Sequence, residues 1–434
     1  MGTLPSQGDA PLAGERSPRR ETQAPPGLLT VQRRRSILAT VKRVFLAGAI
    51  RTPIGKFGGS LRSLTAADLG VVVTRAALGR ARISPADIEE TFFGCARQAG
   101  VGPNVARQIA FRAKIPVDRP ATTINLACAS SLQSLIEAAR AIRAGDREAL
   151  LVGGTESMSN VPHFVFGARW GIPLGKSALV DAMYHDGFHC KLCDLLMGAT
   201  ADKVAREYSI SRAEQDEYAL LSQERTARAI NDGLFKNEIA PVTVKTRGQE
   251  QIIDTDEHPR PDTTLESLAK LAPVFADDGT VTAGNACGIT DGAAAMIVLS
   301  EEALRRLSVK PDAELLGYFQ SGVAPEVMGL SPVPATQGLL ARQKMTLADI
   351  DLIELNEAFA GQALAVLRDL ECDTSRVNIH GGAIALGHPI GATGARILTT
   401  LIHALKTYDK SLGLATLCVS GGQGVSVLIR RVEG

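Results

Sequence analysis

Two stretches of the chain, Ile83-Ser-Pro-Ala-Asp-Ile-Glu-Glu-Thr-Phe92 and Met345-Thr-Leu-Ala-Asp-Ile-Asp-Leu-Ile-Glu354, resemble each other in composition and spacing. Each leads through a short apolar run, typical of a buried strand, to a helical pattern and then to a glycine-rich turn. The similarity continues in two further pairs of segments, 125–131 with 378–396 and 149–154 with 413–418. We infer an internal duplication of an α/β half of roughly 120 residues.

The first half alternates between strand and helix patterns from residue 42 onward. Short apolar runs predict buried strands, and apolar residues three and four apart predict helices. These patterns predict strands at 44–48, 88–94, 122–126 and 149–154, and helices at 66–81, 104–113 and about 130–144.

A long segment in the middle of the chain breaks this rhythm. It carries a polar helix pattern at 211–232, an acid cluster within 250–261 and little strand signal. Insertions on a rigid scaffold often bind ligand, so we interpret the segment as a loop domain that binds substrate. The predicted boundaries are a first half at 42–160 and 281–311, an inserted loop domain at 161–280 and a second half at 312–434.

Residues 1–41 are rich in Pro, Gly, Arg and Ser and show no regular period, so we expect a disordered extension. Arg33-Arg-Arg35 fits a mitochondrial presequence, but Asp9, Glu15 and Glu21 argue against one. We therefore expect a cytoplasmic protein, with the mitochondrial matrix as the alternative.

The bulk composition is that of an ordinary globular protein. Of its 434 residues 45% are hydrophobic and 21% charged, and the net charge of +1 gives no electrostatic reason to expect nucleic acid or an anionic membrane as partner. No apolar run reaches the ~18 residues of a membrane span. The seven cysteines are odd in number, which favours free thiols in a reducing compartment over a disulfide framework.

Cys128 lies in Asn125-Leu-Ala-Cys-Ala-Ser-Ser131, where a predicted strand ends and a helix begins. A helix N-terminus lowers the pKa of a thiol, and a thiolate at this position can attack a thioester carbonyl. The alternative is a small buried cysteine without chemistry, which is the commoner fate of a lone cysteine.

Cys418 lies in Leu417-Cys-Val-Ser-Gly-Gly-Gln-Gly424, where an apolar strand enters a turn whose N–H groups can form an anion nest. A second thiol near Cys128 would act as a base toward a C–H acid. A buried structural cysteine is again the alternative.

His388 lies between Gly387 and Pro389, and Pro389 restricts its backbone. A histidine held in this way can take a thiol proton and then donate to a thioester oxygen; the alternative is a buried structural histidine. Asn356 follows the apolar strand pattern at 350–355. It can orient a water or donate to an oxyanion, or it can cap a helix predicted at 358–370.

Motifs for phosphate, dinucleotide and metal binding are weak. Gly55-Lys56 is not a phosphate loop, because Ile50 and Phe57 replace the residues that such a loop requires, and no G-x-G-x-x-G follows a strand. Four residues loosely meet zinc-ligand spacing, but we favour a place lining the insertion and expect no bound metal. They are His185, His189, Cys190 and Cys193.

Over roughly 42–434 the chain resembles the thiolase family. The resemblance is carried by Val152-Gly-Gly-Thr-Glu-Ser-Met158, Thr282-Ala-Gly-Asn-Ala286, Asn356-Glu-Ala-Phe-Ala360, Gly381-Gly-Ala-Ile-Ala-Leu-Gly-His-Pro-Ile-Gly-Ala-Thr-Gly394 and the turn at 418–424, in that order. It implies an α/β fold whose duplicated halves form one five-layered αβαβα body with a loop domain inserted in the first half. It also implies a homodimer or homotetramer.

The resemblance implies a role for each of five residues. Cys128 would be the acylated nucleophile, and His388 would activate it. His388 and a water on Asn356 would form one oxyanion hole, and the backbone N–H groups of Cys128 and Ser420 would form the other. Cys418 would protonate the leaving enolate in thiolysis, or take the α-proton of acetyl-CoA in synthesis.

The substrates implied are coenzyme A and acyl-CoA, with no cofactor bound permanently. Arg260 and Ser267 match positions near the nucleotide end of coenzyme A. The pantetheine channel would be lined by Met197, Ala283, Cys287, Met328 and Phe359.

Several residues depart from the family pattern. Ala129, Ser131 and Ser420 stand where Gly is common, as in the β subunits of fatty-acid oxidation complexes. Cys287 stands where a Ser usually bonds the pantetheine, and a thiol is a weak donor. Leu196 stands where short-chain acetoacetyl-CoA thiolases usually place His, which favours longer 3-ketoacyl chains.

Together these features predict a 3-ketoacyl-CoA thiolase of fatty-acid β-oxidation, an acetyl-CoA C-acyltransferase working through an acyl-Cys128 intermediate. One alternative is an acetoacetyl-CoA thiolase working in the synthetic direction. Another is a catalytically silent acyl-CoA-binding protein. A ketosynthase that takes carrier-protein substrates is disfavoured, because it would not need Cys418.

Overall fold

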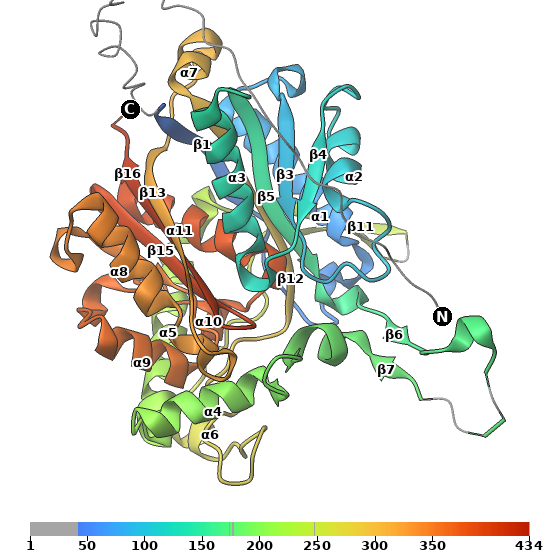
Figure 1. The fold of residues 1–434 in the computed structure, drawn as a ribbon, viewed down its shortest axis with the longest axis vertical. Coiled ribbons are helices and arrows are strands. Elements are labelled where there is room, and N and C mark those ends of the chain that lie inside the picture. Colours follow the sequence, from blue (N-terminus) through green and yellow to red (C-terminus); the bar gives the residue numbers. More distant parts are fainter. Residues whose placement is uncertain (1–41, 173, 176–177, 247, 434) are drawn as a thin grey trace, which may run out of the picture. The chain divides into compact units, whose positions relative to one another are not determined.

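The computed structural model describes residues 42–172, 174–175, 178–246 and 248–433. The predicted N-terminal extension lies outside these residues. Five strands and three long helices build the first half of the fold (Figure 1). They are β1 (Val44–Arg51), β3 (Glu90–Gly94), β4 (Ala121–Ile124), β5 (Ala149–Ser157) and β12 (Thr290–Ser300), with α1 (Ala66–Ala81), α2 (Val105–Arg112) and α3 (Ser130–Ala144).

The second half has the same kinds of element in the same order, except that no strand among its described residues corresponds to β4. Its strands are β13 (Ala313–Gly322), β14 (Leu352–Leu355), β15 (Leu412–Val419) and β16 (Gln423–Arg431). Its helices are α8 (Pro332–Gln343), α9 (Ala360–Asp369), the short α10 (Ala383–Leu386) and α11 (Thr393–Thr407), and α7 (Glu301–Leu307) connects the two halves.

The order of the strands makes the duplication visible. It runs β14-β15-β16-β13-β1-β12-β5-β3-β4, so that each half reads outward from the centre in equivalent steps. The centre is a short antiparallel contact in which Phe45 faces Glu314 and Leu46 faces Ala313. In each half an antiparallel pair of strands is followed outward by a parallel pair. The antiparallel pairs are β12 with β5 and β16 with β15, and the parallel pairs are β5 with β3 and β15 with β14.

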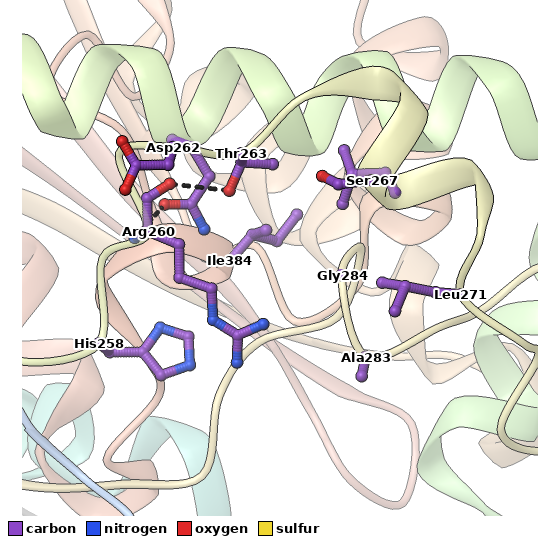
Figure 2. A pocket seen from close by; sticks show the side chains of 11 residues that line it. His258, Arg260, Asp262, Thr263, Ser267, Leu271, Ala283, Gly284 and Ile384 are labelled. Carbon is purple, nitrogen blue, oxygen red and sulfur yellow. Dashed lines mark hydrogen bonds between the residues drawn. The ribbon is translucent and has the colours of Figure 1, made fainter.

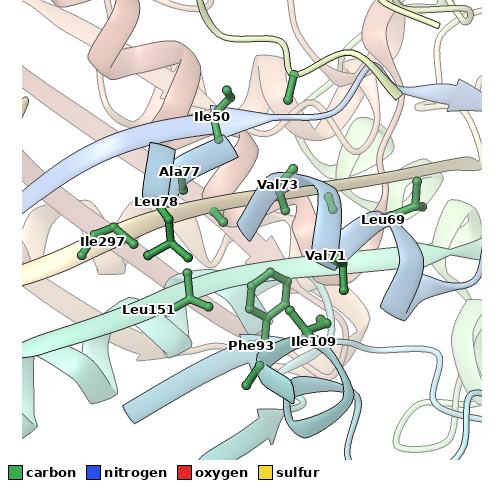
Figure 3. Close-up of a cluster of buried hydrophobic side chains, with 14 of the residues drawn as sticks. Ile50, Leu69, Val71, Val73, Ala77, Leu78, Phe93, Ile109, Leu151 and Ile297 are labelled. Carbon is green, nitrogen blue, oxygen red and sulfur yellow. The ribbon is translucent and has the colours of Figure 1, made fainter. Parts of the chain in front are cut away.

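Three apolar clusters separate the elements into five layers. Side chains of α1 and α2 pack on one face of the first-half strands, where Phe93 and Ile109, both labelled in Figure 3, lie against Gly70 of α1. Side chains of α3 and α11 pack together with strands of both halves. Side chains of α8 and α9 cover the outer face of β14. The resulting order is helix, sheet, helix, sheet, helix, which confirms the predicted αβαβα fold.

The central helix layer follows the periodicity of the sequence. In α3 the predicted apolar stripe is fully buried, and in α11 almost every side chain is buried because sheets lie on both sides of it. A helix buried on all sides needs apolar or internally bonded residues around its whole circumference. The two helices of this layer therefore have their N-terminal turns fixed next to each other, and these turns carry the residues considered below.

Between 161 and 280 the described residues form short hairpins and three α-helices. The hairpins pair β6 (His163–Phe164) with β7 (Val180–Asp181), β8 (His189–Cys190) with β9 (Leu195–Leu196) and β10 (Val242–Thr246) with β11 (Gln249–Ile253). The helices are α4 (Met197–Glu207), α5 (Arg212–Asn231) and α6 (Leu265–Ala269). A buried guanidinium, Arg51 on β1, ties the segment to the sheet through Glu238 at 2.6 Å and Asp256 at 2.7 Å.

One predicted strand differs in its surroundings. The run at 122–126 was expected to be buried, but β4 is the outermost strand of its half and Thr122 is exposed. The expectation of burial was wrong because an edge strand has a neighbour on one side only. Within the described residues, no helix is both long enough and apolar enough to span a membrane.

Candidate active site

Cys128 lies on a 3-10 turn, Ala127–Ala129, between β4 and α3. The hydroxyl of Ser130 closes the turn with two hydrogen bonds. It donates to the carbonyl of Ala127 at 2.6 Å and accepts the N–H of Leu126 at 2.9 Å. Ala127 has a φ of 42°, a left-handed conformation that costs energy for a residue other than glycine. The turn leaves the half-buried Cys128 thiol facing a small cavity.

His388 reaches the Cys128 thiol from the second half. It lies between α10 and α11, and its Nε2 is 3.2 Å from Cys128 Sγ. On the other side of the ring, Nδ1 is 2.6 Å from the hydroxyl of Thr393. That hydroxyl donates its single proton to the carbonyl of Pro389 at 3.0 Å, so it accepts from Nδ1–H. This leaves Nε2 unprotonated and facing the thiol, which is the tautomer that a base requires.

Small residues allow the two turns to approach. A Cβ on Gly154 would lie 2.1 Å from the carbonyl oxygen of Gly391, and one on Gly94 would lie 2.6 Å from the N–H nitrogen of Ser131. The buried carboxylate of Glu156 then accepts N–H bonds from Gly391 at 2.8 Å and from Arg97 at 3.0 Å. Sequence reasoning did not identify this role of Glu156, because such a clamp depends on contacts between distant segments.

The protein around the cavity shifts the pKa of both Cys128 and His388. Burial raises the pKa of the Cys128 thiol above its ordinary value, although the charge of Arg97 and the N–H groups of Ser420 and Cys128 act in the opposite direction. The expectation that the helix N-terminus makes this thiol acidic was therefore wrong: desolvation outweighs it. Burial and the charges of Arg396 and Arg97 lower the pKa of His388 to about 3, so the imidazole is neutral at physiological pH.

Cys418 lies near the end of β15, and its side chain is 1% exposed. It lines the same cavity as Cys128 and His388, which has a volume of about 60 Å³. Burial, followed by the nearby thiols of Cys128 and Cys287, raises the pKa of Cys418 far above its ordinary value. A thiol of this kind stays protonated and can donate a proton to a strong carbon base. Ser420, in the turn that follows, lines the cavity as well.

Asn356 is fully buried directly after β14. Neither atom of its side-chain amide bonds to any residue in the described part of the chain. Native proteins rarely bury an amide without a partner, so such a group is expected to hold a water or a ligand. The alternative role as a helix cap was wrong, because α9 begins after Phe359, which is its N-cap residue.

Glu357 has a role that the sequence did not reveal. Its buried carboxylate accepts hydrogen bonds from Ser222 at 2.7 Å, Asn378 at 2.8 Å, Tyr218 at 3.2 Å and the N–H of Ile384 at 3.2 Å. The first and third come from α5 and the others from the segment that leads to His388. Glu357 therefore fixes the backbone on which Asn356 lies, and it joins that backbone to the inserted segment.

Three adjoining cavities connect the thiols with the surface of the inserted segment. An outer cavity of about 280 Å³ contains Arg260 and Ser267 (Figure 2). A middle cavity of about 210 Å³ shares Ala283 with the outer one and His388 with the inner one. The inner cavity is the one that contains Cys128. Each residue predicted to bind coenzyme A lines at least one of the three: Arg260, Ser267, Ala283, Met197, Cys287, Phe359 and Met328.

The four residues with zinc-like spacing do not converge on one point. His185 contacts Asp186 at 2.6 Å, and His189 contacts Asp194 at 2.9 Å. Among the described residues no group of three or more His, Cys, Asp or Glu side chains could hold a metal ion. All seven cysteines lie in the described part and are free.

Comparisons with known proteins agree on a single family. Residues 44–302 match the model "Thiolase, N-terminal domain", and residues 309–431 match "Thiolase, C-terminal domain". The chain is 47% identical over 394 residues to an acetyl-CoA acetyltransferase of Escherichia coli (strain K12), covering 91% of this chain and 100% of the relative. It is 45% identical over 394 residues to a probable acetyl-CoA acyltransferase of Staphylococcus epidermidis, with the same coverage.

Solved structures give the same result. Human mitochondrial 3-ketoacyl-CoA thiolase matches with a TM-score of 0.88 and 43% identity, covering 91% of this chain and all of that chain. Its complex with CoA matches with a TM-score of 0.88 and 42% identity, covering 91% of this chain and 99% of that chain.

Proposed function

This chain belongs to the thiolase family, and from that premise we propose that it is an acyltransferase that cleaves 3-ketoacyl-CoA with coenzyme A. The observation that carries the proposal is the 3.2 Å contact between Cys128 Sγ and His388 Nε2, in a cavity that Cys418 also lines. A nucleophile, a correctly oriented base and a separate proton donor are the groups that this reaction needs.

In the first step His388 Nε2 takes the proton of the Cys128 thiol while Sγ attacks the C3 carbonyl of the substrate. Because burial disfavours a separated thiolate–imidazolium pair, proton transfer and attack are expected to occur together. The backbone N–H groups of Cys128 and Ser420 lie close enough to Cys128 Sγ to lower the pKa of the thiol. An oxyanion on the carbon bonded to Sγ would therefore lie within their reach.

In the second step the C2–C3 bond breaks, and its electron pair passes to C2 of the departing acetyl-CoA enolate. Cys418, whose thiol burial keeps protonated, gives its proton to C2. The enolate oxygen would be stabilised by His388 and by a water on the buried amide of Asn356. The thiol of a second coenzyme A then gives its proton to the Cys418 thiolate and attacks the acyl-Cys128 thioester. The shortened acyl-CoA leaves, and His388 returns its proton to the Cys128 thiolate.

Coenzyme A would enter along the three cavities. The guanidinium of Arg260 in the outer cavity supplies positive charge for the phosphates, with Ser267 beside it. The pantetheine arm would pass Ala283, and Cys287 in the middle cavity. The CoA complex of the human mitochondrial 3-ketoacyl-CoA thiolase supports coenzyme A as a substrate.

The test is a thiolysis assay that follows the loss of absorbance of Mg²⁺-complexed 3-ketoacyl-CoA at several chain lengths. Acyl-enzyme is trapped in parallel by incubating the protein with acyl-CoA and digesting it. A mass increase on the peptide that contains Cys128 is expected. Turnover without acylation of Cys128, or no turnover at any chain length, would contradict the proposal.

A second candidate is an acetyl-CoA acetyltransferase that works in the synthetic direction. It is supported by the relatives at 46–47% identity that are named acetyl-CoA acetyltransferases. The chain-length profile separates the two, because this candidate turns over acetoacetyl-CoA alone. The remaining parts of the proposal are a homodimer or homotetramer, a role in fatty-acid β-oxidation, and a cytoplasmic location with the mitochondrial matrix as the alternative.

A further inference from the structure

Arg97 places a buried positive charge in the cavity of the reacting groups. It follows β3, its residue is 7% exposed, and it lines the inner cavity together with Cys128, His388 and Cys418. Most of the remaining wall is apolar, with Phe188, Met328, Phe359 and Ile390 among its residues. The stretch Gly94-Cys-Ala-Arg-Gln98 gave no sign of this role in the sequence.

The guanidinium of Arg97 has few partners. Its only hydrogen bond within the described residues runs from Nη1 to the carbonyl of Asp186 at 3.4 Å, and its buried Nε has no acceptor. Among those residues no carboxylate lies within 4.0 Å of it. Its carbon Cζ lies 6.0 Å from the centre of the Phe188 ring, and Gly187 packs against it, since a Cβ there would lie 2.3 Å from Nη2.

Burial raises the pKa of Glu156 and the charge of Arg97 acts to lower it, but the two side chains form no ion pair, and the oxygens of Glu156 are already used. They accept the N–H groups of Ala96, Arg97 and Gly391 at 3.1, 3.0 and 2.8 Å. A buried cation without an ion pair is costly, and proteins usually compensate such a charge at a functional site by binding an anion. The planar fork of a guanidinium fits a carboxylate with two parallel hydrogen bonds.

We propose that Arg97 binds a carboxylate at the far end of the acyl chain, so that the preferred substrate is a 3-ketoacyl-CoA derived from a short dicarboxylic acid. The inference rests on the proposed function. The phosphates of coenzyme A do not compete for Arg97, because they are assigned to Arg260 in the outer cavity. The small inner cavity of about 60 Å³ favours a short chain.

In this reaction Cys128 Sγ bonds to C3, the C2–C3 bond breaks, and Cys418 protonates C2 of the released acetyl-CoA. The retained acyl group carries its terminal carboxylate against Arg97 until coenzyme A displaces it from Sγ. A different role for Arg97 is to stabilise the Cys128 thiolate, since its charge lowers the pKa of Cys128 and of His388. The two roles predict different results.

The test compares two CoA thioesters of equal length, that of 3-oxohexanedioic acid and that of 3-oxohexanoic acid. We expect the wild-type kcat/KM to be higher for the acid-ended substrate. Arg97→Leu should reduce the ratio of the two kcat/KM values by about 100-fold or more, since it removes one partner of a buried charge pair. Arg97→Lys should retain part of the ratio. Arg107→Leu, which removes a half-buried arginine of α2 bonded to loop carbonyls, should leave the ratio unchanged.

A fall of both kcat/KM values by the same factor in Arg97→Leu would overturn the proposal in favour of thiolate stabilisation. A wild-type preference for the methyl-ended substrate would also overturn it.

Binding separates this inference from the proposed function. In a Cys128→Ala background, calorimetry with the CoA thioesters of butanedioic and butanoic acid should show tighter binding of the acid. Arg97→Leu should abolish that difference. Equal affinities would overturn the role of Arg97 even if thiolysis occurs. A preference for the acid without thiolysis by the wild type would support Arg97 and reject the proposed function.

Discussion

The two halves of the molecule share one frame and carry different chemistry at equivalent places. A turn before the central helix holds Cys128 in the first half and His388 in the second. The strands beside these turns also differ: β5 of the first half carries Gly154, and β15 of the second carries Cys418. Gly154 lies against the carbonyl of Gly391 with no room for a side chain, whereas Cys418 faces a cavity.

This difference shows how a duplicated scaffold can form a site without symmetry. Both central helices begin in the same layer, so the duplication brings their first turns together. In the proposed mechanism one copy supplies the nucleophile and the other supplies the base and the acid. The glycines on the first copy let the two turns approach, and the thiol of Cys418 on the second copy lines the inner cavity.

The largest expected effect is loss of the nucleophile. Cys128→Ala should reduce kcat for thiolysis by at least about 10⁴-fold, because the covalent route disappears. Cys372→Ala removes a thiol that packs in the outer cluster with α9 and should leave kcat within about twofold. Thiolysis kinetics on both variants checks this. Substantial turnover by Cys128→Ala would contradict the assignment of Cys128 as the nucleophile that the first half contributes.

The next effect concerns Cys418, the thiol that the second half contributes to the cavity. Cys418→Ala should reduce thiolysis by about 10²–10⁴-fold, the range expected for loss of a proton donor. It should still allow Cys128 to be acylated by acetyl-CoA, because that step does not involve C2. Exchange of deuterium into the methyl group of acetyl-CoA should also be lost. If exchange continues at the wild-type rate, Cys418 is not the group that moves this proton.

The protonation state of the Cys128 thiol distinguishes this site from one that holds a preformed thiolate. Because its pKa is raised, the thiol is mostly protonated at neutral pH, and its ionised fraction increases with pH. The rate of alkylation by iodoacetamide should therefore rise by about tenfold per pH unit from pH 7 to 8.5. Mass spectrometry of the Cys128 peptide measures this rate. A plateau below pH 8 would mean that the thiolate already dominates in the resting enzyme.

A smaller effect is expected from the residue that orients His388. Thr393→Val removes the acceptor of Nδ1–H and should lower kcat/KM about tenfold, the value of one hydrogen bond of this kind. Thr393→Ser keeps the hydroxyl and should recover most of the activity. If Val and Ser lower kcat/KM equally, the effect comes from packing rather than from the tautomer.

The smallest expected effect compares two asparagines at the start of equivalent segments. Asn378 is buried and bonds to the backbone of Leu355 at 2.8 and 2.9 Å and to Glu357 at 2.8 Å. Asn378→Ala should lower the free energy of unfolding by about 2–3 kcal/mol. Asn125 is exposed; its side chain donates to the carbonyl of Ala96 at 3.2 Å and accepts the N–H of Ala127 at 3.0 Å, and Asn125→Ala should cost about 1 kcal/mol. Urea denaturation measures both values. Equal losses of the free energy of unfolding would contradict the structural role assigned to Asn378.

The fold could be read from the sequence because its signals are local. The apolar stripe of α3 and the apolar run of β5 matched the predicted elements closely, and the repeated stretches predicted two halves. The burial of β4 could not be read in this way. Whether a strand is central or at an edge depends on which strands pair with it, and those partners are far away in the sequence.

The sequence by itself determined the duplicated α/β fold and the residue types of the candidate site, because periodicity and motif spacing are properties of neighbouring residues. Only the tertiary structure decided which of these residues meet. The contact of Cys128 with His388, the tautomer set by Thr393, the carboxylate clamps of Glu156 and Glu357 and the unpaired charge of Arg97 all join segments that are distant in the chain or depend on their packing. The raised pKa of Cys128 has the same origin, because desolvation is produced by everything that surrounds a group and not by the helix on which it lies.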